Sequence, residues 1–292
     1  MSQETAMEDH VFHAGDCLDY LRSLATDSVD LVLCSPPYEN ARQYSIGFNL
    51  KGQEYVDWCV ERYKECVRVS RGLVAWVIEG RTSKFQWTAS PALLMADLHR
   101  AGVRLRKPPA YHRVGIPGSG GPDWWRNDYE FVVCASKGRL PWSDPCAFGH
   151  PPKWNPGGDL SHRMPNGRRV AKMHTKTQAD GSKRSQGYTP PAKANPGNVI
   201  RCVVGGGQMG HALSHENEAP YPLDLASRFV LSFCPVGGTV LDPFCGSGTT
   251  MHAAAVSGRK SINVDIRDSQ IDLCKRRLSS LNSNGASLHV NE

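Results

Sequence analysis

The chain has 292 residues, of which 40% are hydrophobic and 8% aromatic, so it can bury one sizeable core together with an inserted region. Its formal net charge is +6, and a single internal stretch accounts for this excess. No apolar run approaches the length that crosses a bilayer, and the acidic start MSQETAMED is unlike a secretion signal, so we expect a cytoplasmic protein without membrane contact. The ten cysteines form no CxxC pair, which indicates neither a zinc site nor a disulfide framework, and we expect no metal.

Predicted strands and helices alternate through the first half of the chain. The apolar run VDLVLC predicts a buried strand at 29–34, and the roughly helical spacing of the following apolar residues predicts a helix at 53–69. Ser90 and Pro91 are typical of an N-cap followed by proline in the first helical turn, and Gly102 suits the end of that helix. Further strands are predicted at 73–79, near 104–114 and at 129–135.

The stretch from Arg139 to Arg201 differs in composition from the rest of the chain. It holds nine prolines and seven glycines in 63 residues, too many for regular elements, so we expect loops on a small scaffold. Eleven Lys or Arg against three Asp or Glu give it a formal charge of +8. Trp142, Trp154 and Tyr188 are interleaved with the basic residues, which suits phosphate contact and base stacking. Composition alone does not exclude the alternative that this stretch is a flexible, solvated insertion that binds no ligand.

The last third of the chain continues the alternation. Pro222 begins a predicted helix that runs to about Cys234, followed by a strand at 239–242 and a final helix at 268–281. This order predicts a Rossmann-like α/β fold, a doubly wound and mostly parallel sheet with helices on both faces. Ligands bind such sheets at the carboxyl ends of the strands.

The strand at 239–242 leads into DPFCGSGTT, which has the layout of a nucleotide-type cofactor loop. Asp242 ends the strand, and Gly246 and Gly248 let the backbone approach a ligand before an alanine-rich helix begins. Asp265 follows 23 residues after Asp242, at the end of a second strand-like run, where a carboxylate can accept both hydroxyls of a ribose. An ordinary capped turn between strand and helix explains the glycines but not the downstream acid.

The strand at 29–34 leads into SPPY. Pro36 and Pro37 hold the backbone extended, so the Pro36 carbonyl has no helical partner and can face a ligand. Ser35 adds an oxygen that accepts or donates a hydrogen bond, and Tyr38 adds a flat face on which a base can stack. In isolation, SPPY is explained as well by a turn that closes a strand, with Tyr38 packed as a lid. The presence of DPFCGSGTT in the same chain favours a binding site.

At these residues the chain resembles the DNA amino-methyltransferases that use S-adenosylmethionine, in the permuted, beta-class order in which the catalytic motif precedes the cofactor loop. The similarity includes AGDCLDYLRSLATDSVDLVLCSPPY, RGLVAWVIEG, NDYEFVVCASKG, EAPYPLDLASRFVLSFCPVGGTVLDPFCGSGTT and INVDIRDSQIDLCKRRL. It implies a catalytic half of the core at 1–138, a target-recognition region at 139–214 and a cofactor-binding half at 215–292. S-adenosylmethionine as cofactor and double-stranded DNA as partner are implied with them.

The resemblance also implies a role for each motif residue. Ser35, Pro36, Pro37 and Tyr38 form the catalytic set, in which a base flipped from the duplex stacks on Tyr38 and gives its amino hydrogens to the Ser35 side chain and the Pro36 carbonyl. These oxygens stabilise the nitrogen as it becomes positive in its attack on the sulfonium methyl, without a covalent enzyme intermediate. The resemblance further implies that Asp265 binds the ribose of the cofactor. The residues that it assigns to the methionine end of the cofactor and to the glycine loop are Asp242, Phe244, Gly246, Ser247, Gly248 and Thr249.

Two residues near the first motif each allow two interpretations. Asp16 matches a family position near the adenine of the cofactor, but it equally suits a helix-capping carboxylate before LDYLRSL. Cys34 invites comparison with the cysteine nucleophile of cytosine-ring methylation. That chemistry is associated with a Pro-Cys dipeptide, whereas Cys34 ends an apolar strand, so we expect a buried structural thiol.

The serine before Pro-Pro, with RQY shortly after it, looks more like the cytosine-N4 branch of the family than the adenine-N6 branch, where Asp or Asn is commoner. We therefore predict a site-specific cytosine-N4 DNA methyltransferase, with adenine N6 as the alternative. Further alternatives are an RNA or protein methyltransferase, a basic nucleic-acid-binding module without activity, and a nicotinamide oxidoreductase, although GSG is not GxGxxG. The resemblance is compatible with a bacterial, archaeal or phage protein, with a homodimer and with a companion restriction endonuclease.

Overall fold

The computed structural model describes residues 8–39, 47–115, 121–152, 160–172, 174–177, 183–186, 191–204, 209–217 and 219–284. By its internal contacts the chain forms two compact units, one of Met1–Asp144 with Gly197–Glu292 and one of Pro145–Pro196. The second unit lies inside the stretch 139–214 that was predicted to recognise the target. Among the described residues, no helix is both long enough and apolar enough to span a membrane.

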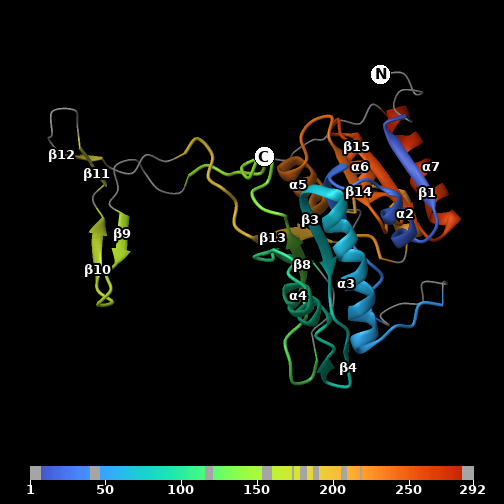
Figure 1. Cartoon of the computed structure of the whole chain (residues 1–292), viewed down its shortest axis with the longest axis horizontal. Coiled ribbons are helices and arrows are strands. Elements are labelled where there is room, and N and C mark those ends of the chain that lie inside the picture. The colour runs from blue at the N-terminus through green and yellow to red at the C-terminus, as the bar shows by residue number, and fades with distance from the viewer. Residues whose placement is uncertain are drawn as a thin grey trace. The chain divides into compact units, whose positions relative to one another are not determined.

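The larger unit is built on one sheet (Figure 1). In order across the sheet, the strands of the described residues are β1 (His10–Ala14), β15 (Lys260–Asp265), β14 (Thr239–Asp242), β2 (Val29–Cys34), β3 (Ser70–Ile78), β8 (Tyr129–Ala135), β7 (Ala110–Val114) and β13 (Val199–Val203), with β6 (Leu105–Arg106) paired to β8. The five strands from β1 to β3 are parallel to one another, and β13 is parallel to β7. The antiparallel pairs among the described strands of this sheet all include β8. The predicted mostly parallel sheet is therefore confirmed.

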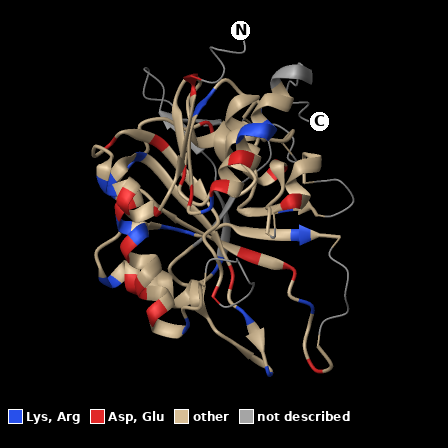
Figure 2. Cartoon of the chain, turned by 90° about the vertical axis from the view of Figure 1, so that its right-hand side faces the viewer, with Lys and Arg blue, Asp and Glu red and all other residues tan. Residues whose placement is uncertain are grey.

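Alternate residues of the central strands pack against helices on opposite faces of the sheet. Val32 and Cys34 of β2 belong to a core cluster with residues of α2, α3 and α4, whereas Leu31 and Leu33 belong to a cluster with α5 and α6. Burying one such aliphatic side chain stabilises the fold by about 1.5–3 kcal/mol. Few charged residues lie on the central strands (Figure 2). Helices within the described residues include α2 (Cys17–Ser23), α3 (Gly52–Val69), α4 (Ser90–Arg100), the 3-10 helix η1 (Ala212–Glu216), α5 (Leu223–Phe233), α6 (Thr249–Ala255) and α7 (Asp268–Asn284).

The start of α4 differs from the prediction. Ala89, with a left-handed φ of 57°, occupies the N-cap position, and Ser90 is already the first helical residue. The Ser90 hydroxyl donates to the carboxylate of Glu39, which in turn accepts from the backbone of Gly52 at 2.7 Å. Ser90 therefore links two segments of the chain instead of capping its own helix. A short hairpin, β4 (Thr82–Ser83) and β5 (Gln86–Trp87), separates β3 from α4.

The smaller unit contains regular elements where we expected loops. Its strands form two antiparallel hairpins, β9 (Leu160–Arg163) with β10 (Arg169–Lys172), and β11 (His174–Thr177) with β12 (Lys183–Gln186). Most prolines and glycines of this unit precede β9 or follow β12, whereas Gly167 takes a left-handed φ of 81° in the turn that joins β9 to β10. Composition thus indicated the segments on either side of the paired strands but concealed the short strands themselves.

Candidate active site

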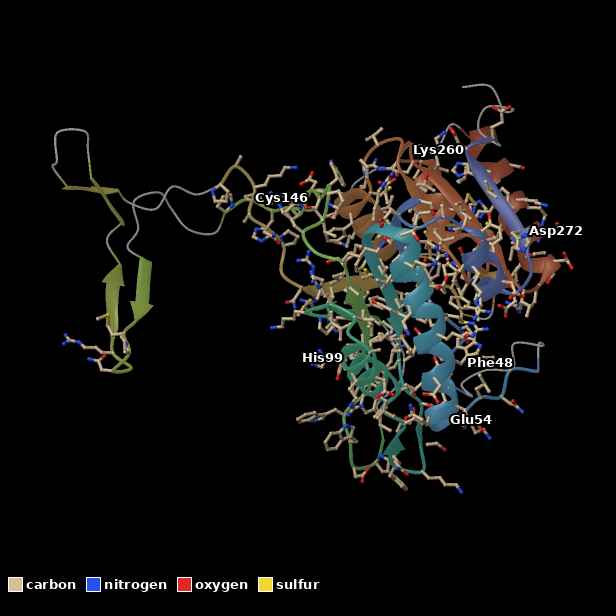
Figure 3. All side chains as sticks on the ribbon, in the orientation of Figure 1. Phe48, Glu54, His99, Cys146, Lys260 and Asp272 are labelled. Carbon is tan, nitrogen blue, oxygen red and sulfur yellow. The ribbon has the colours of Figure 1, made fainter. Side chains whose placement is uncertain are left out.

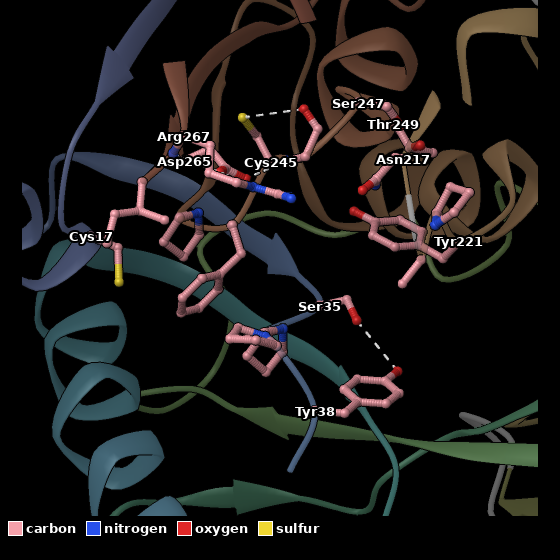
Figure 4. Close-up of a pocket in the computed structure, with 18 of the residues that line it drawn as sticks. Cys17, Ser35, Tyr38, Asn217, Tyr221, Cys245, Ser247, Thr249, Asp265 and Arg267 are labelled. Carbon is pink, nitrogen blue, oxygen red and sulfur yellow. Dashed lines mark hydrogen bonds and ion pairs between the residues drawn. The ribbon is translucent and has the colours of Figure 1, made fainter. Parts of the chain in front are cut away.

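Sheet order places the two sequence motifs side by side. β2 and β14 are adjacent and parallel, with Leu31 opposite Val240 and Val32 opposite Leu241, so both strands end at the same edge. SPPY follows β2 and DPFCGSGTT follows β14. Both motifs line one pocket of about 800 Å³, as expected for ligand sites at the carboxyl ends of parallel strands. Figure 4 shows Ser35 and Tyr38 on one side of this pocket, with Asp265, Cys245 and Ser247 across from them.

The turn of the second motif requires its glycines. Gly246 and Gly248 have left-handed φ angles of 47° and 75°. A Cβ atom on Gly248 would lie 2.4 Å from the Cys274 sulfur, so the helix α7 packs directly against this turn. The Gly246 amide donates to Asp265 Oδ2 at 3.1 Å, which ties the turn to the end of β15. Gly246 lines the pocket, whereas Gly248 lies behind its wall.

Asp265 lines the pocket with its carboxylate anchored on one side. Its Oδ1 atom accepts from the Arg267 amide at 3.0 Å and from Arg267 Nε at 3.5 Å, and its Oδ2 atom accepts from Gly246. An ionised carboxylate has about four acceptor positions, so one remains for a ribose hydroxyl. The Ser247 hydroxyl, also in the pocket wall, is buried and has no hydrogen-bond partner among the described residues. The glycine turn, the anchored carboxylate and the unpartnered hydroxyl all fit the nucleoside and amino-acid ends of S-adenosylmethionine.

Asp242 lies beneath the pocket and does not line it. The residue is 1% exposed, and its Oδ1 atom accepts from the Phe244 amide at 3.0 Å. The Tyr221 hydroxyl lies 3.4 Å from its Oδ2 atom and also contacts the Thr250 hydroxyl. Burial, reinforced by the nearby Asp265 charge, raises the pKa of Asp242 to about 7. Through Phe244 and Tyr221, both of which do line the pocket, Asp242 holds the wall in place.

An aromatic wall closes one side of the pocket, and of its residues only Phe244 was predicted as part of a site. Phe244 lies between two indoles, with ring centroids 5.7 Å from Trp58 and 5.6 Å from Trp76. Phe48 packs on Trp58 at 5.1 Å, near the start of α3 (Figure 3). Phe48, Trp58 and Phe244 line the pocket and provide an apolar surface for a flat ring. The helical spacing of Trp58 indicated a core position but not a ligand contact.

Both interpretations of Asp16 are compatible with its position. Its Oδ1 atom accepts from the amides of Leu18 and Asp19 at 2.7 and 3.4 Å, so the predicted helix cap is confirmed. Its Oδ2 atom accepts from Arg62 at 3.2 Å, and that guanidinium lies 4.2 Å from the centre of the Trp58 ring. Asp16 also lines the pocket, so a contact with the cofactor stays a prediction.

A buried guanidinium supports the glycine turn from below. Arg277 is fully buried and donates to the Ser247 carbonyl and to the Thr249 hydroxyl, both at 3.1 Å. Its other nitrogen atoms lie 2.9 and 3.2 Å from His252 Nδ1. Burial, together with the charge of Arg277, lowers the pKa of His252 to about 3, so the imidazole is neutral and accepts. Nothing in the run CKRRL indicated which arginine points inward.

All four residues of the first motif line the same pocket. The Ser35 hydroxyl donates to the Tyr38 oxygen at 3.3 Å, and the Pro37 carbonyl accepts from Tyr55 at 3.0 Å. Glu130, which accepts from the Tyr38 hydroxyl at 2.7 Å, lies 92 residues further along the chain. Cys34 is fully buried, and this burial raises the pKa of its thiol well above its usual value. The expected structural thiol is therefore confirmed.

Comparison with known proteins places this chain among DNA-modifying enzymes. A family described as DNA methylase matches residues 29–276. The orphan methyltransferase M.BamHII of Bacillus amyloliquefaciens is 28% identical over 260 residues, covering 86% of this chain and 89% of that protein. The DNA adenine methyltransferase YhdJ of Escherichia coli K12 is 26% identical over 275 residues, covering 90% and 81%. The cytosine-N4-specific PvuII DNA methyltransferase superposes with a TM-score of 0.63 over 97% of this chain and 98% of that chain, at 18% identity, which establishes the shared fold.

Proposed function

Because this chain belongs to the DNA methylase family, whose enzymes use S-adenosylmethionine to methylate amino groups of DNA bases, we propose that it methylates the N4 amine of cytosine in duplex DNA. The observation that supports this proposal most is the shared pocket of SPPY and DPFCGSGTT. In it, the acceptor side and the cofactor side of the reaction lie within one cavity. Direct transfer between them then needs no intermediate carrier on the protein.

On the acceptor side, the reaction needs an amine that is a poor nucleophile to attack. Its lone pair is delocalised into the ring, and the nitrogen becomes positive as its bond to the methyl group forms. Loss of one amino proton to water then gives the neutral methylated amine. We propose that the Ser35 hydroxyl oxygen and the Pro36 carbonyl accept the two amino hydrogens, which stabilises the developing charge more than the ground state. The Tyr38 ring supports the flipped base by stacking and by attraction of the developing cation. These roles assume that the base enters beside SPPY.

On the cofactor side, we propose that Asp265 binds a ribose hydroxyl and that the turn around Gly246 binds the methionine end. When bound, S-adenosylmethionine supplies an activated methyl group on a positive sulfur. The aromatic residues Phe48, Trp58 and Phe244 exclude water from one side of the pocket and offer a surface for the adenine ring. Asp16 is placed to contribute at the same end.

The choice of base rests on Ser35. A hydroxyl in this position suits the cytosine-N4 branch that SPPY resembles, and the PvuII enzyme that shares this fold is described as specific for cytosine N4. Adenine N6 is the second candidate, because the relative YhdJ is described as a DNA adenine methyltransferase. A carboxylate would accept from either amine more strongly than a hydroxyl does, but neither reaction strictly requires one.

Expression in a host without DNA methylation, followed by sequencing that detects modified bases, tests this proposal. We expect N4-methylcytosine at one recurring sequence. N6-methyladenine at a recurring sequence would instead establish the second candidate. Unmodified host DNA, together with no methyl incorporation into the same DNA by the purified protein, would contradict the proposed activity. A companion endonuclease and a homodimer stay predictions from the resemblance.

A further inference from the structure

Next to Ser35 and Tyr38, the pocket wall contains a carboxylate that is itself held by a guanidinium. Glu130, in β8, is 8% exposed and lines the pocket together with Arg113 of β7. The Tyr38 hydroxyl donates to Glu130 Oε2 at 2.7 Å, and Arg113 lies 3.0 Å from Glu130 Oε1. With the 3.3 Å bond from Ser35 to Tyr38, these four side chains form one continuous row. The row begins at the serine that is proposed to meet the target amine.

Each bond in this row has a fixed direction. A carboxylate oxygen accepts hydrogen bonds and donates none, so the Tyr38 proton must point to Glu130. The Tyr38 oxygen then presents lone pairs to Ser35, and the single proton of Ser35 must point to Tyr38. The lone pairs of Ser35 that remain are therefore acceptors. The 3.3 Å link is longer than the usual 2.5–3.0 Å for O–H···O, so it is weaker than the 2.7 Å bond from Tyr38 to Glu130.

We propose that Glu130 is a positioning residue that, through Tyr38, makes the Ser35 hydroxyl an acceptor for the target amine. The proposal rests on the proposed function and deepens it. A serine that is free to rotate can donate its proton to the amine nitrogen, where it competes for the lone pair that must attack the methyl group. Glu130 removes this competing orientation. Arg113 supports Glu130, since a second guanidinium bond to the Asn127 carbonyl at 3.0 Å fixes it on the β7–β8 connection.

A double-mutant cycle between Tyr38 and Glu130 tests the row. Tyr38→Phe keeps the stacking ring and removes only the proton that Glu130 accepts. Glu130→Gln keeps the shape and supplies an amide that can donate to the Tyr38 oxygen, which reverses the direction. We expect each single variant to lower kcat by about 10–100-fold, while the dissociation constant for S-adenosylmethionine stays within about twofold. We expect the double variant to match Tyr38→Phe alone, because one break already interrupts the row.

Asp128→Asn is the matched control, since it makes the same charge change near the start of the same strand. Asp128 pairs with His112 and Arg126 at 3.5 Å and does not line the pocket, so kcat should be unchanged. If Glu130→Gln keeps the wild-type kcat, or if the effects of the two single variants multiply, the row does not orient Ser35. Should Glu130→Gln fail to fold, Tyr38→Phe is compared in the wild-type and Ser35→Ala backgrounds. An equal loss in both backgrounds would overturn the proposal.

Failure of this inference can be told apart from failure of the proposed function. Wild-type protein and Ser35→Ala are assayed first for methyl transfer to DNA. If the wild type transfers no methyl group, the proposed function itself is wrong. If the wild type is active and Ser35→Ala retains full kcat, Ser35 is not the acceptor and the positioning role of Glu130 is wrong with it. If Ser35→Ala is impaired while Tyr38 and Glu130 act independently, only the positioning role of Glu130 is wrong.

Discussion

At the scale of single residues, the Ser35 hydroxyl donates a hydrogen bond to Tyr38 within the protein and is proposed to accept one from the target amine. Ser35→Ala removes this oxygen and leaves the cofactor side of the pocket unchanged. Loss of one oriented polar contact to a transition state lowers kcat by about 10²–10³-fold, and we expect a loss of this size. Calorimetric titration should give an unchanged affinity for S-adenosylmethionine. Ser23→Ala, at the last residue of α2 and not among the residues that line the pocket, is the control, and equal losses in kcat and cofactor affinity would contradict the acceptor role.

A second prediction at this scale concerns Asp265. Asp265→Asn keeps one carbonyl oxygen but removes a charged acceptor, and a hydrogen bond to a charged group contributes about 1.5–3 kcal/mol, so cofactor affinity should fall by roughly 10–100-fold. At saturating cofactor, kcat should change little, because the group that would contact the ribose is remote from the transferred methyl. Asp268→Asn, at the start of α7 and outside the pocket, is the control. An unchanged dissociation constant for Asp265→Asn would exclude the ribose role.

At the scale of elements, the support of the cofactor turn predicts a pH effect on stability. The pKa of Asp242 is raised to about 7 from an ordinary value near 4, so the folded state binds this proton more tightly than the unfolded state does. Its contribution to stability is complete below the unfolded pKa and is lost as pH rises through the folded pKa. Above about pH 8 the loss amounts to a few kcal/mol.

Asp242→Asn removes this titration. We expect the wild type to lose stability relative to Asp242→Asn between about pH 4 and pH 8, as measured by urea unfolding at each pH. The difference between the two proteins isolates Asp242 from the buried histidines, which titrate in both. If the two curves of unfolding free energy against pH run parallel over this range, Asp242 is not protonated in the folded protein at neutral pH.

The predicted elements show which physical signals the sequence carries. β2 and β14 were predicted with their correct bounds because both are buried on two faces and therefore form continuous apolar runs. β1, with sequence HVFHA, was not predicted, since this edge strand is partly exposed and mixes polar with apolar residues. The cap at Ser90 was wrong because a tertiary partner, Glu39, takes its hydroxyl.

The site was predictable only where its residues form local motifs. SPPY and the glycine turn carry their own spacing, and the shared edge of β2 and β14 follows from the rule on carboxyl ends. Glu130 and Arg113 reach the pocket through an antiparallel pair of strands, and no periodicity links them to Tyr38 across some 90 positions. Residues brought together by register between distant strands leave no signal in one sequence.

At the scale of the whole molecule, the positive charge is concentrated in the unit Pro145–Pro196. It contains nine Lys or Arg and two Asp or Glu, a formal +7, so the remainder of the chain has a formal charge of −1. Strand register places Lys176 opposite Arg184 and Arg163 opposite Arg169. Like charges directly opposite each other destabilise a hairpin unless an anion compensates them. A DNA backbone supplies such anions.

Replacing Lys176, Lys183 and Arg184 by Gln tests whether these residues contact the phosphates of DNA. Each lost phosphate contact reduces the slope of log affinity against log salt by about 0.9, so three should reduce it by roughly 3. Affinity for S-adenosylmethionine should stay unchanged, because every described residue that lines the pocket belongs to the larger unit. The triple variant of exposed lysines in the larger unit, Lys51, Lys64 and Lys275 to Gln, is the control. Equal slopes for the wild type and the hairpin variant would place DNA binding elsewhere on the molecule.

The central claim is that one pocket joins an activated methyl group to an exocyclic amine. It is tested most directly by incubating purified wild-type protein with duplex DNA and S-adenosylmethionine carrying an isotope-labelled methyl group, and then analysing the nucleosides by mass spectrometry. We predict label in N4-methyldeoxycytidine and a strong reduction of that label with Ser35→Ala. Label on carbon 5 of cytosine, or no label in any nucleoside of DNA that contains the recognised sequence, would contradict the account.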